Sequence, residues 1–113
     1  IMDERIGTFI DEADAYTQCE AAGYVAMKFD FPAEENEFHW HDFDSMTFIT
    51  GGELTVFDVD SGESRTCSSG TKLVGRKGVV HREKSEGYSA IIGFAVDPKT
   101  LTQPINKPLP VTL

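Results

Sequence analysis

Short runs of β-favouring residues, separated by turns, constrain the fold of this chain more than any other feature. In residues 24–31 the apolar side chains recur at a period of two, and the run ends at Pro32. That alternation is typical of a β-strand with one buried face. Further strands are predicted over 38–41, 45–50, 54–59, 64–67, 72–74, 79–83 and 88–96, with a tight hairpin at Gly51–Gly52. Strands this short, with a turn every six to ten residues, predict an all-β sandwich or barrel and leave no room for βαβ units.

The two ends of the chain differ from this central region, 24–97. Residues 1–23 predict a short helix starting near Thr8 or Asp11, or an edge strand, and the helical pattern breaks from Thr17. Residues 98–113 hold four of the five prolines, which excludes a helix or a central strand and predicts an extended arm. The arm has apolar side chains that favour docking on the barrel or on a second subunit. They are Leu101, Ile105, Leu109 and Val111.

Composition excludes several classes of function. The chain has 113 residues, which predicts one domain with a hydrophobic core. Its net charge of −9 argues against sequence-independent binding to nucleic acid or to an anionic membrane. No apolar stretch approaches the roughly 20 residues of a membrane helix. Cys19 and Cys67 are expected to be free thiols in a reducing cytoplasm, because nothing resembles an export signal or a disulfide-dense spacing. The expected partner is therefore a small molecule.

All three histidines lie in predicted β structure. His39 and His41 are two residues apart, so on a strand their imidazoles point to the same face, with Trp40 on the other. His81 follows a turn at 75–78 and enters a later strand. If the two strands face each other across a barrel, three imidazole nitrogens converge in its interior, where they can bind a metal ion.

These residues resemble the two motifs of the cupin superfamily, and the resemblance extends from about Phe29 to Val96. In the first motif a His-X-His pair precedes an acid and then a glycine that closes a hairpin. Those places are taken here by His39, His41, Ser45 and Gly52. In the second motif a glycine precedes a proline, a second glycine and a histidine. Those places are taken by Gly70, Arg76, Gly78 and His81, at unbroken spacing. The resemblance implies a small single-domain cupin, whose fold is a double-stranded β-helix, a jelly-roll-like barrel.

Three positions depart from the family pattern. Ala33 stands in place of a glycine, Arg76 in place of the proline and Ser45 in place of the glutamate. The family's site of three histidines and one glutamate is therefore absent. Asp44 can supply a fourth ligand only if the 42–44 turn is one residue longer than predicted, because adjacent strand residues point to opposite faces. Asp42 and Asp44 are better explained as turn formers that bond their own backbone.

Three neutral imidazoles suit Fe, Zn, Ni, Mn or Cu as divalent ions. With no carboxylate to offset its charge, the ion favours a small polar or anionic metabolite that supplies the missing negative charge. The ligand set resembles that of thiol dioxygenases within the family, so a metal-dependent dioxygenase is the first enzymatic prediction, and an isomerase or lyase the second. The alternative is a non-catalytic ligand-binding or sensor cupin without a catalytic metal, because this fold hosts both.

The residues around the histidines carry further predictions. Trp40, Met46 and Phe48 face away from the site, and this apolar strip favours packing on a second sheet or a homodimer interface. Thr47, Ile49 and the run from Tyr88 are expected to line the barrel. One basic cluster stands near the predicted mouth, where it would steer anions or simply form a solvated turn. It consists of Arg76, Lys77 and Arg82.

Overall fold

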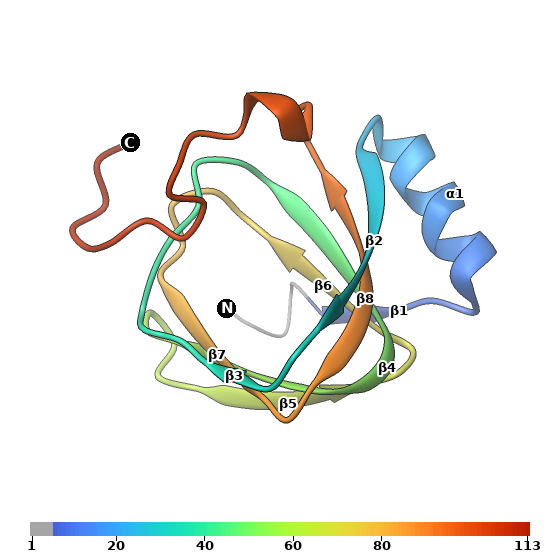
Figure 1. The fold of residues 1–113 in the computed structure, drawn as a ribbon, viewed down its shortest axis with the longest axis horizontal. Coiled ribbons are helices and arrows are strands. Elements are labelled where there is room, and N and C mark those ends of the chain that lie inside the picture. The colour runs from blue at the N-terminus through green and yellow to red at the C-terminus, as the bar shows by residue number, and fades with distance from the viewer. Residues whose placement is uncertain (1–5) are drawn as a thin grey trace.

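The structure is a computed structural model that describes residues 6–113. Its elements in chain order are β1 (Ile6–Thr8), α1 (Glu12–Ala22), β2 (Val25–Phe31), β3 (Glu34–Glu35), β4 (Ser45–Asp58), β5 (Ser64–Ser68), β6 (Thr71–Gly75), β7 (His81–Ser85), β8 (Tyr88–Phe94) and the 3₁₀ helix η2 (Pro98–Thr100). The strands surround a common interior, and α1 lies outside them (Figure 1). The predicted all-β architecture is confirmed.

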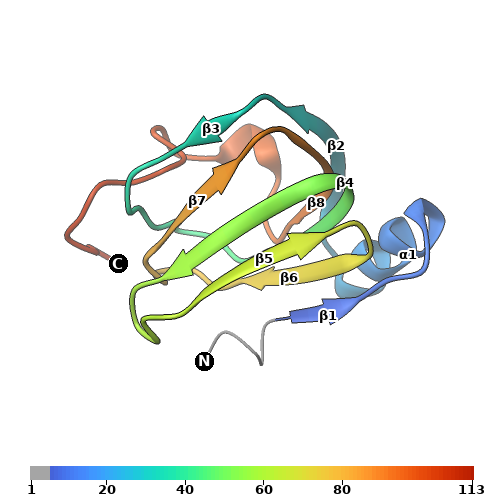
Figure 2. The ribbon, with the colours of Figure 1, turned by 90° about the horizontal axis from the view of Figure 1, so that it is seen from below.

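The long strand β4 joins the two halves of the sheet. Its first half pairs antiparallel with β6 and β8, and β1 and β2 extend this half at its two edges. Its second half pairs antiparallel with β5 and β7, and β3 extends this half beside β7. Figure 2 shows β4 running between these neighbours along the length of the barrel. One strand therefore fixes both walls of the interior.

Gly51 and Gly52 mark the place where β4 passes from one half to the other. The pairing with β8 shifts register between Ile49 and Gly51, and Gly52 has a φ of 73°. A Cβ at Gly52 would collide with the carbonyl oxygen of Gly87. Only glycine combines this left-handed backbone with so close an approach. The predicted hairpin at Gly51–Gly52 is therefore wrong: the two glycines bend a continuous strand instead of reversing it.

The N-terminal segment contains both of its predicted alternatives. β1 pairs with β6 at the sheet edge, and α1 begins after Asp11, whose side chain accepts a hydrogen bond of 2.8 Å from the Asp14 amide. The helix continues past Thr17 to Ala22 and ends at Gly23, which has a φ of 75°. The predicted break at Thr17 is wrong, because tertiary packing of the helix outweighs its weak pattern. Residues 1–5 of this segment lie outside the described residues.

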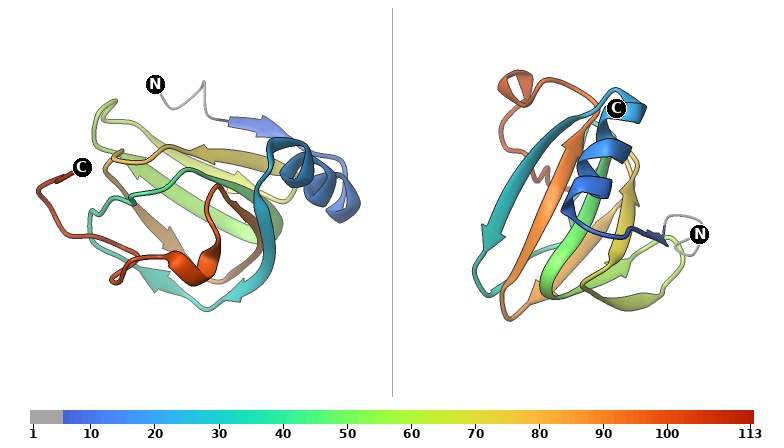
Figure 3. Two further views of the ribbon diagram at one scale, coloured as in Figure 1. Left: turned by 90° about the horizontal axis from the view of Figure 1, so that it is seen from above. Right: turned by 90° about the vertical axis from the view of Figure 1, so that its right-hand side faces the viewer.

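Helix α1 covers the outer face of β4 and β8 (Figure 3). Ala15 and Cys19 are fully buried against Phe48 and Ile91, and Met46 packs at the margin of this cluster. Met46 and Phe48 therefore point away from the interior, as the alternation predicted, but the chain's own helix covers them. They do not supply the surface on which a homodimer was predicted. The homodimer itself remains a prediction.

The segment 32–41 differs from its prediction. The acidic loop contains β3, which pairs with β7, whereas 38–41 is irregular and forms only isolated bridges. His39 bridges to His81, and Trp40 bridges to Lys107 of the C-terminal arm. Trp40 is buried by this arm rather than by a second subunit, and its indole donates a 2.9 Å hydrogen bond to the Pro108 carbonyl.

The C-terminal arm, 98–113, begins with η2 and then crosses the strand ends (Figure 1). Docking is confirmed for its middle, where Ile105 lines the interior and Lys107 pairs with Trp40. Leu109 and Val111 remain exposed on the single chain, so for these two residues docking on a second subunit stays a prediction. The short helix η2 also departs from a wholly extended arm, since Pro98 occupies its first turn, where a proline is tolerated.

A second buried cluster fills the part of the interior remote from the histidines. It contains Ile49, Leu54, Cys67 and Ala90. Cys67 and Cys19 are both free, as predicted, and both are buried. Among the described residues, no helix is long and apolar enough to cross a membrane.

Candidate metal centre

A cavity of about 330 Å³ occupies the interior between the two halves of the sheet. Its walls are largely apolar and aromatic, with residues from β2, β4, β8 and the loop before β4. Among them are Phe29, Phe31, Phe43, Val56, Ile92 and Phe94. Ser45, Thr47 and Tyr88 also line it, as the alternation predicted. Charged side chains also line the cavity, among them Glu34, Asp58, Arg65 and Arg76, so its walls combine apolar and charged groups.

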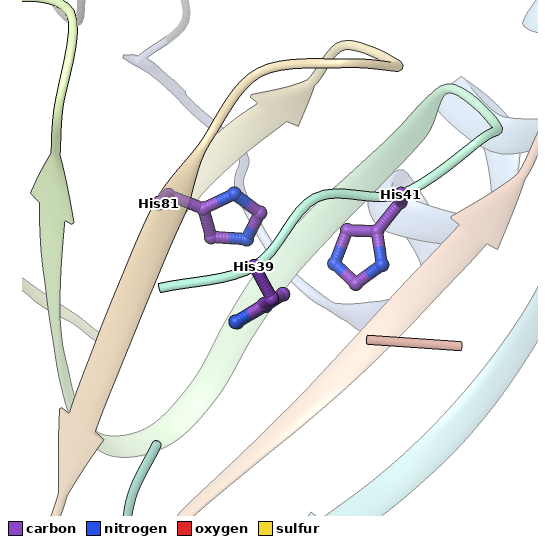
Figure 4. A group of neighbouring side chains, drawn as sticks. All are labelled: His39, His41 and His81. Atoms are coloured by element: carbon purple, nitrogen blue, oxygen red, sulfur yellow. The ribbon is translucent and has the colours of Figure 1, made fainter. Parts of the chain in front are cut away.

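The three histidines meet at one end of this interior (Figure 4). Each offers one nitrogen, and the three nitrogens lie within 4.8 Å of one another. His39 and His41 come from the irregular segment before β4, whereas His81 begins β7. Reciprocal backbone hydrogen bonds of 2.9 Å between His39 and His81 hold the two segments side by side. The predicted convergence of His39, His41 and His81 is present in the structure.

Backbone carbonyl oxygens orient all three imidazole rings. Nδ1 lies 2.8 Å from the Glu37 oxygen in His39, 2.9 Å from the Ile105 oxygen in His41, and 3.1 Å from the Val79 oxygen in His81. A carbonyl can only accept a hydrogen bond, so each Nδ1 carries the proton. With the proton on Nδ1, a neutral ring presents the lone pair of Nε2, which is the form that binds a metal ion.

Glu83 lies beside two of the three imidazoles. Its Oε1 is 3.2 Å from Nε2 of His39 and 3.3 Å from Nε2 of His81. Burial alone would raise the pKa of this carboxyl, but His39 and His81, when they carry a proton on Nε2, outweigh burial and hold the pKa far below its usual value. Glu83 is therefore an anion at neutral pH that lies beside His39 and His81.

The donor set fits a divalent transition metal ion. Nε2 of His39 is buried and makes no hydrogen bond, although a buried polar atom normally has a partner. Burial, the largest influence on the pKa of His39, lowers it, but Glu83 and the Glu37 carbonyl raise it above its usual value. Burial lowers the pKa of His41, which favours its neutral, ligating form. An ion would satisfy the buried nitrogen and neutralise the carboxylate together.

The other candidate ligands have different places. Asp44 accepts a 2.8 Å hydrogen bond from the Lys77 amide, and its own carbonyl accepts one from the Ala95 amide, so it ties its loop to distant segments rather than bonding its own turn, the role that was predicted. Asp42 lies 3.8 Å from the Lys107 ammonium group. Ser45 lines the cavity from β4, but its neutral hydroxyl is a poor ligand. Asp44 is therefore not the fourth ligand considered from the sequence.

The predicted basic cluster is dispersed. Arg76 lines the cavity, whereas Arg82 points to the other face of β7. There its guanidinium lies 4.2 Å from the Phe57 ring centroid and 3.6 Å from Glu35. The steering role predicted for Arg76, Lys77 and Arg82 as a group is wrong, because strand alternation turns Arg82 away from the histidines.

Glu83 is the functional candidate that the sequence reasoning missed. Its signal was available: Glu83 is two residues beyond His81, the same spacing that placed His39 and His41 on one face. Applied to 79–83, that rule puts Val79, His81 and Glu83 toward the interior, where all three line the cavity.

Comparisons with solved structures show that the fold is that of the cupins. No family model matches the chain, and no curated protein sequence matches it. A solved protein from Neisseria meningitidis is 29% identical, with a TM-score of 0.55, over 64% of this chain and 73% of its own. A DUF861 family protein from Thermotoga maritima is 18% identical, with a TM-score of 0.61, over 80% of this chain and 97% of its own. A cupin-2 domain protein from Shewanella frigidimarina is 25% identical, with a TM-score of 0.52, over 61% and 67% of the two chains.

Proposed function

We propose that this chain, a small cupin, binds one divalent transition metal ion through His39, His41 and His81 and uses it on a small molecule held in the barrel. The observation that carries the proposal is the state of the three rings. Every Nδ1 is engaged by a backbone carbonyl, and the three rings are close enough for one nitrogen of each to lie within 4.8 Å of the others. Structural histidines have no reason to share this arrangement, whereas metal ligands require it.

A bound ion of this kind acts as a Lewis acid and, if it is iron, as a centre for oxidation by O₂. Histidine ligands suit Fe, Zn, Ni and Cu, with Mn as a further candidate. The chain's own contribution is to orient the three rings, to surround them with apolar walls that exclude water, and to leave one side of the group open to the cavity. Oxidation by O₂ at iron is the first reaction to test, followed by isomerisation or elimination.

The cavity sharpens the ligand class. At about 330 Å³ it is at the lower end of the range for small-molecule sites. Its aromatic and aliphatic walls favour an apolar body rather than a wholly polar metabolite. A dication next to Arg76 favours an anionic head. We therefore expect a small carboxylate or thiolate whose apolar part lies along Phe29 and Phe31.

Metal titration tests the binding site. Protein stripped with a chelator and titrated with Zn²⁺ or Co²⁺ in a calorimeter is expected to bind one ion per chain. The double variant His39→Ala/His81→Ala is expected to lose this binding. Thr47→Ala, which changes the cavity wall on β4, is the control and is expected to bind like the wild type. Equal binding by the double variant and the wild type would overturn the proposal.

Oxygen consumption tests the reaction. Iron-loaded protein is mixed with small apolar carboxylic acids and thiols, and O₂ uptake and thermal unfolding are followed in parallel. Uptake that depends on both iron and the added acid or thiol supports a dioxygenase. A raised unfolding midpoint without turnover in any metal form supports the ligand-binding alternative.

A further inference from the structure

We propose that Glu83 is the fourth protein ligand of this metal centre, and that it takes over from β7 the role that the cupin pattern gives to an acid at the position of Ser45. This inference rests on the proposed metal site. It concerns a residue that lies outside both cupin motifs as they occur in this chain.

The distances carry the first step. Two ligands bound to one ion at about 2.0–2.1 Å are about 2.9–3.4 Å apart in octahedral or tetrahedral geometry. Oε1 of Glu83 is 3.2 Å from Nε2 of His39 and 3.3 Å from Nε2 of His81. The carboxylate oxygen therefore already has the separation from two histidine nitrogens that neighbouring ligands of a single ion require.

The hydrogen bonding carries the second step. Nε2 of His39 is buried and lies 3.2 Å from the carboxylate without a hydrogen bond. In the neutral ring the proton is on Nδ1, at the Glu37 carbonyl, so Nε2 and the carboxylate are both acceptors. Two acceptors this close repel unless a second proton or a metal ion lies between them. A metal ion removes that repulsion at both His39 and His81.

Placement in the fold carries the third step. Glu83 pairs with Val56 across the ladder between β7 and β4, so its backbone is fixed in regular structure. Its amide donates a 2.7 Å hydrogen bond to the Asn36 side chain, and its carbonyl accepts one of 3.1 Å from the Asn36 amide. The side chain is 23% exposed, within the cavity lining. A ligand on so firmly held a strand needs only side-chain rotation to reach an ion.

Charge explains why the chain tolerates serine at position 45. With Ser45, three neutral imidazoles would leave the ion at its full +2 charge with no anionic ligand, at a high desolvation cost in a buried site. Glu83 restores the −1 contribution that the absent acid would have supplied. The centre then keeps one positive charge for an anionic ligand.

The variant Glu83→Gln tests this role, because it keeps the side-chain volume and removes the charge. Its matched control is Glu53→Gln, which makes the same charge change at an exposed position of β4 outside the cavity lining. Both are loaded with Co²⁺, and affinity is measured by chelator competition while the visible absorption spectrum reports the ligand set. Thermal unfolding without metal shows whether each variant is folded.

For Glu83→Gln we expect a loss of affinity of at least tenfold, with one ion still bound per chain, and a Co²⁺ spectrum that differs from the wild type. For Glu53→Gln we expect wild-type affinity and spectrum. An unchanged spectrum in Glu83→Gln, with or without a change in affinity, would overturn the assignment of Glu83 as a ligand. Failure of the wild type to bind metal would instead remove the proposed function, so the two results are distinguishable.

Discussion

The two ends of the chain both pack on the barrel, but they contact opposite parts of it. Helix α1 covers the outer face of β4 and β8 through Ala15 and Cys19, far from the histidines. The C-terminal arm covers the irregular histidine segment and supplies the Ile105 carbonyl that orients His41. The contact of α1 is apolar packing without a fixed hydrogen bond to the site, whereas the contact of the arm is a hydrogen bond that fixes one imidazole ring. We infer that α1 stabilises the fold and that the arm positions the metal ligands.

Replacing Phe48 with alanine should cause the largest loss of stability and should leave metal affinity unchanged. Phe48 is fully buried between β4 and α1 and makes an edge-to-face contact with Phe9 at 5.3 Å. Phe48→Ala is expected to lower the free energy of unfolding by about 3–5 kcal/mol, because it leaves a cavity under the helix. Urea unfolding measures this loss. Metal affinity of the folded variant should stay at the wild-type value, and a large fall would contradict the division of roles.

Removing residues 104–113 should lower metal affinity and leave the β structure in place. The truncation takes away the Ile105 carbonyl and Lys107, the bridge partner of Trp40. We expect metal affinity to fall about 10–100-fold, as when other groups that orient metal-bound histidines are removed. Calorimetric titration measures the affinity, and far-ultraviolet circular dichroism checks that the β structure survives. Undiminished affinity in the folded truncation would show that the arm does not position His41.

A smaller effect is expected from Trp40→Phe, which removes only the indole hydrogen bond to Pro108. The loss of one buried hydrogen bond lowers stability by about 0.5–1.5 kcal/mol. Hydrogen exchange should increase at the Lys107 amide, which bonds the Trp40 carbonyl at 3.0 Å, and not in α1. Equal increases in both regions would mean that the variant loosens the whole barrel.

The smallest effect is expected from Lys28→Ala on the helix side. Lys28 forms a 3.0 Å ion pair with Glu12, and both side chains are about half exposed, at 51% and 49%. Solvent screens such a pair, so the thermal midpoint and metal affinity should both stay within error of the wild type. A clear fall in the midpoint would show that α1 depends on charge as well as on its buried face.

Local alternation was enough to predict much of this molecule. The period-two runs gave β2 and the cavity-facing side of β4, and the two motifs brought His39, His41 and His81 together. The failures have non-local causes. Gly51–Gly52 resembles a hairpin in sequence, but the close approach of Gly87 makes it a bend inside one strand.

Two further failures depend on contacts between distant segments. The strip containing Phe48 had the composition of an interface, and only the tertiary fold shows that α1 covers it. The orientation of His41 depends on a carbonyl 64 residues away, which no local pattern encodes. Glu83 is a different case, because the spacing rule applied to the first histidine pair would have placed it beside His81.

The central claim is that the three histidines hold one metal ion in this barrel. The most direct test is a crystal of metal-loaded protein with diffraction measured on both sides of the metal absorption edge. We expect one anomalous peak per chain, about 2.0–2.1 Å from Nε2 of His39, His41 and His81, with a Glu83 oxygen at a similar distance. A peak elsewhere, or none at the histidines in protein loaded with metal, would contradict the account.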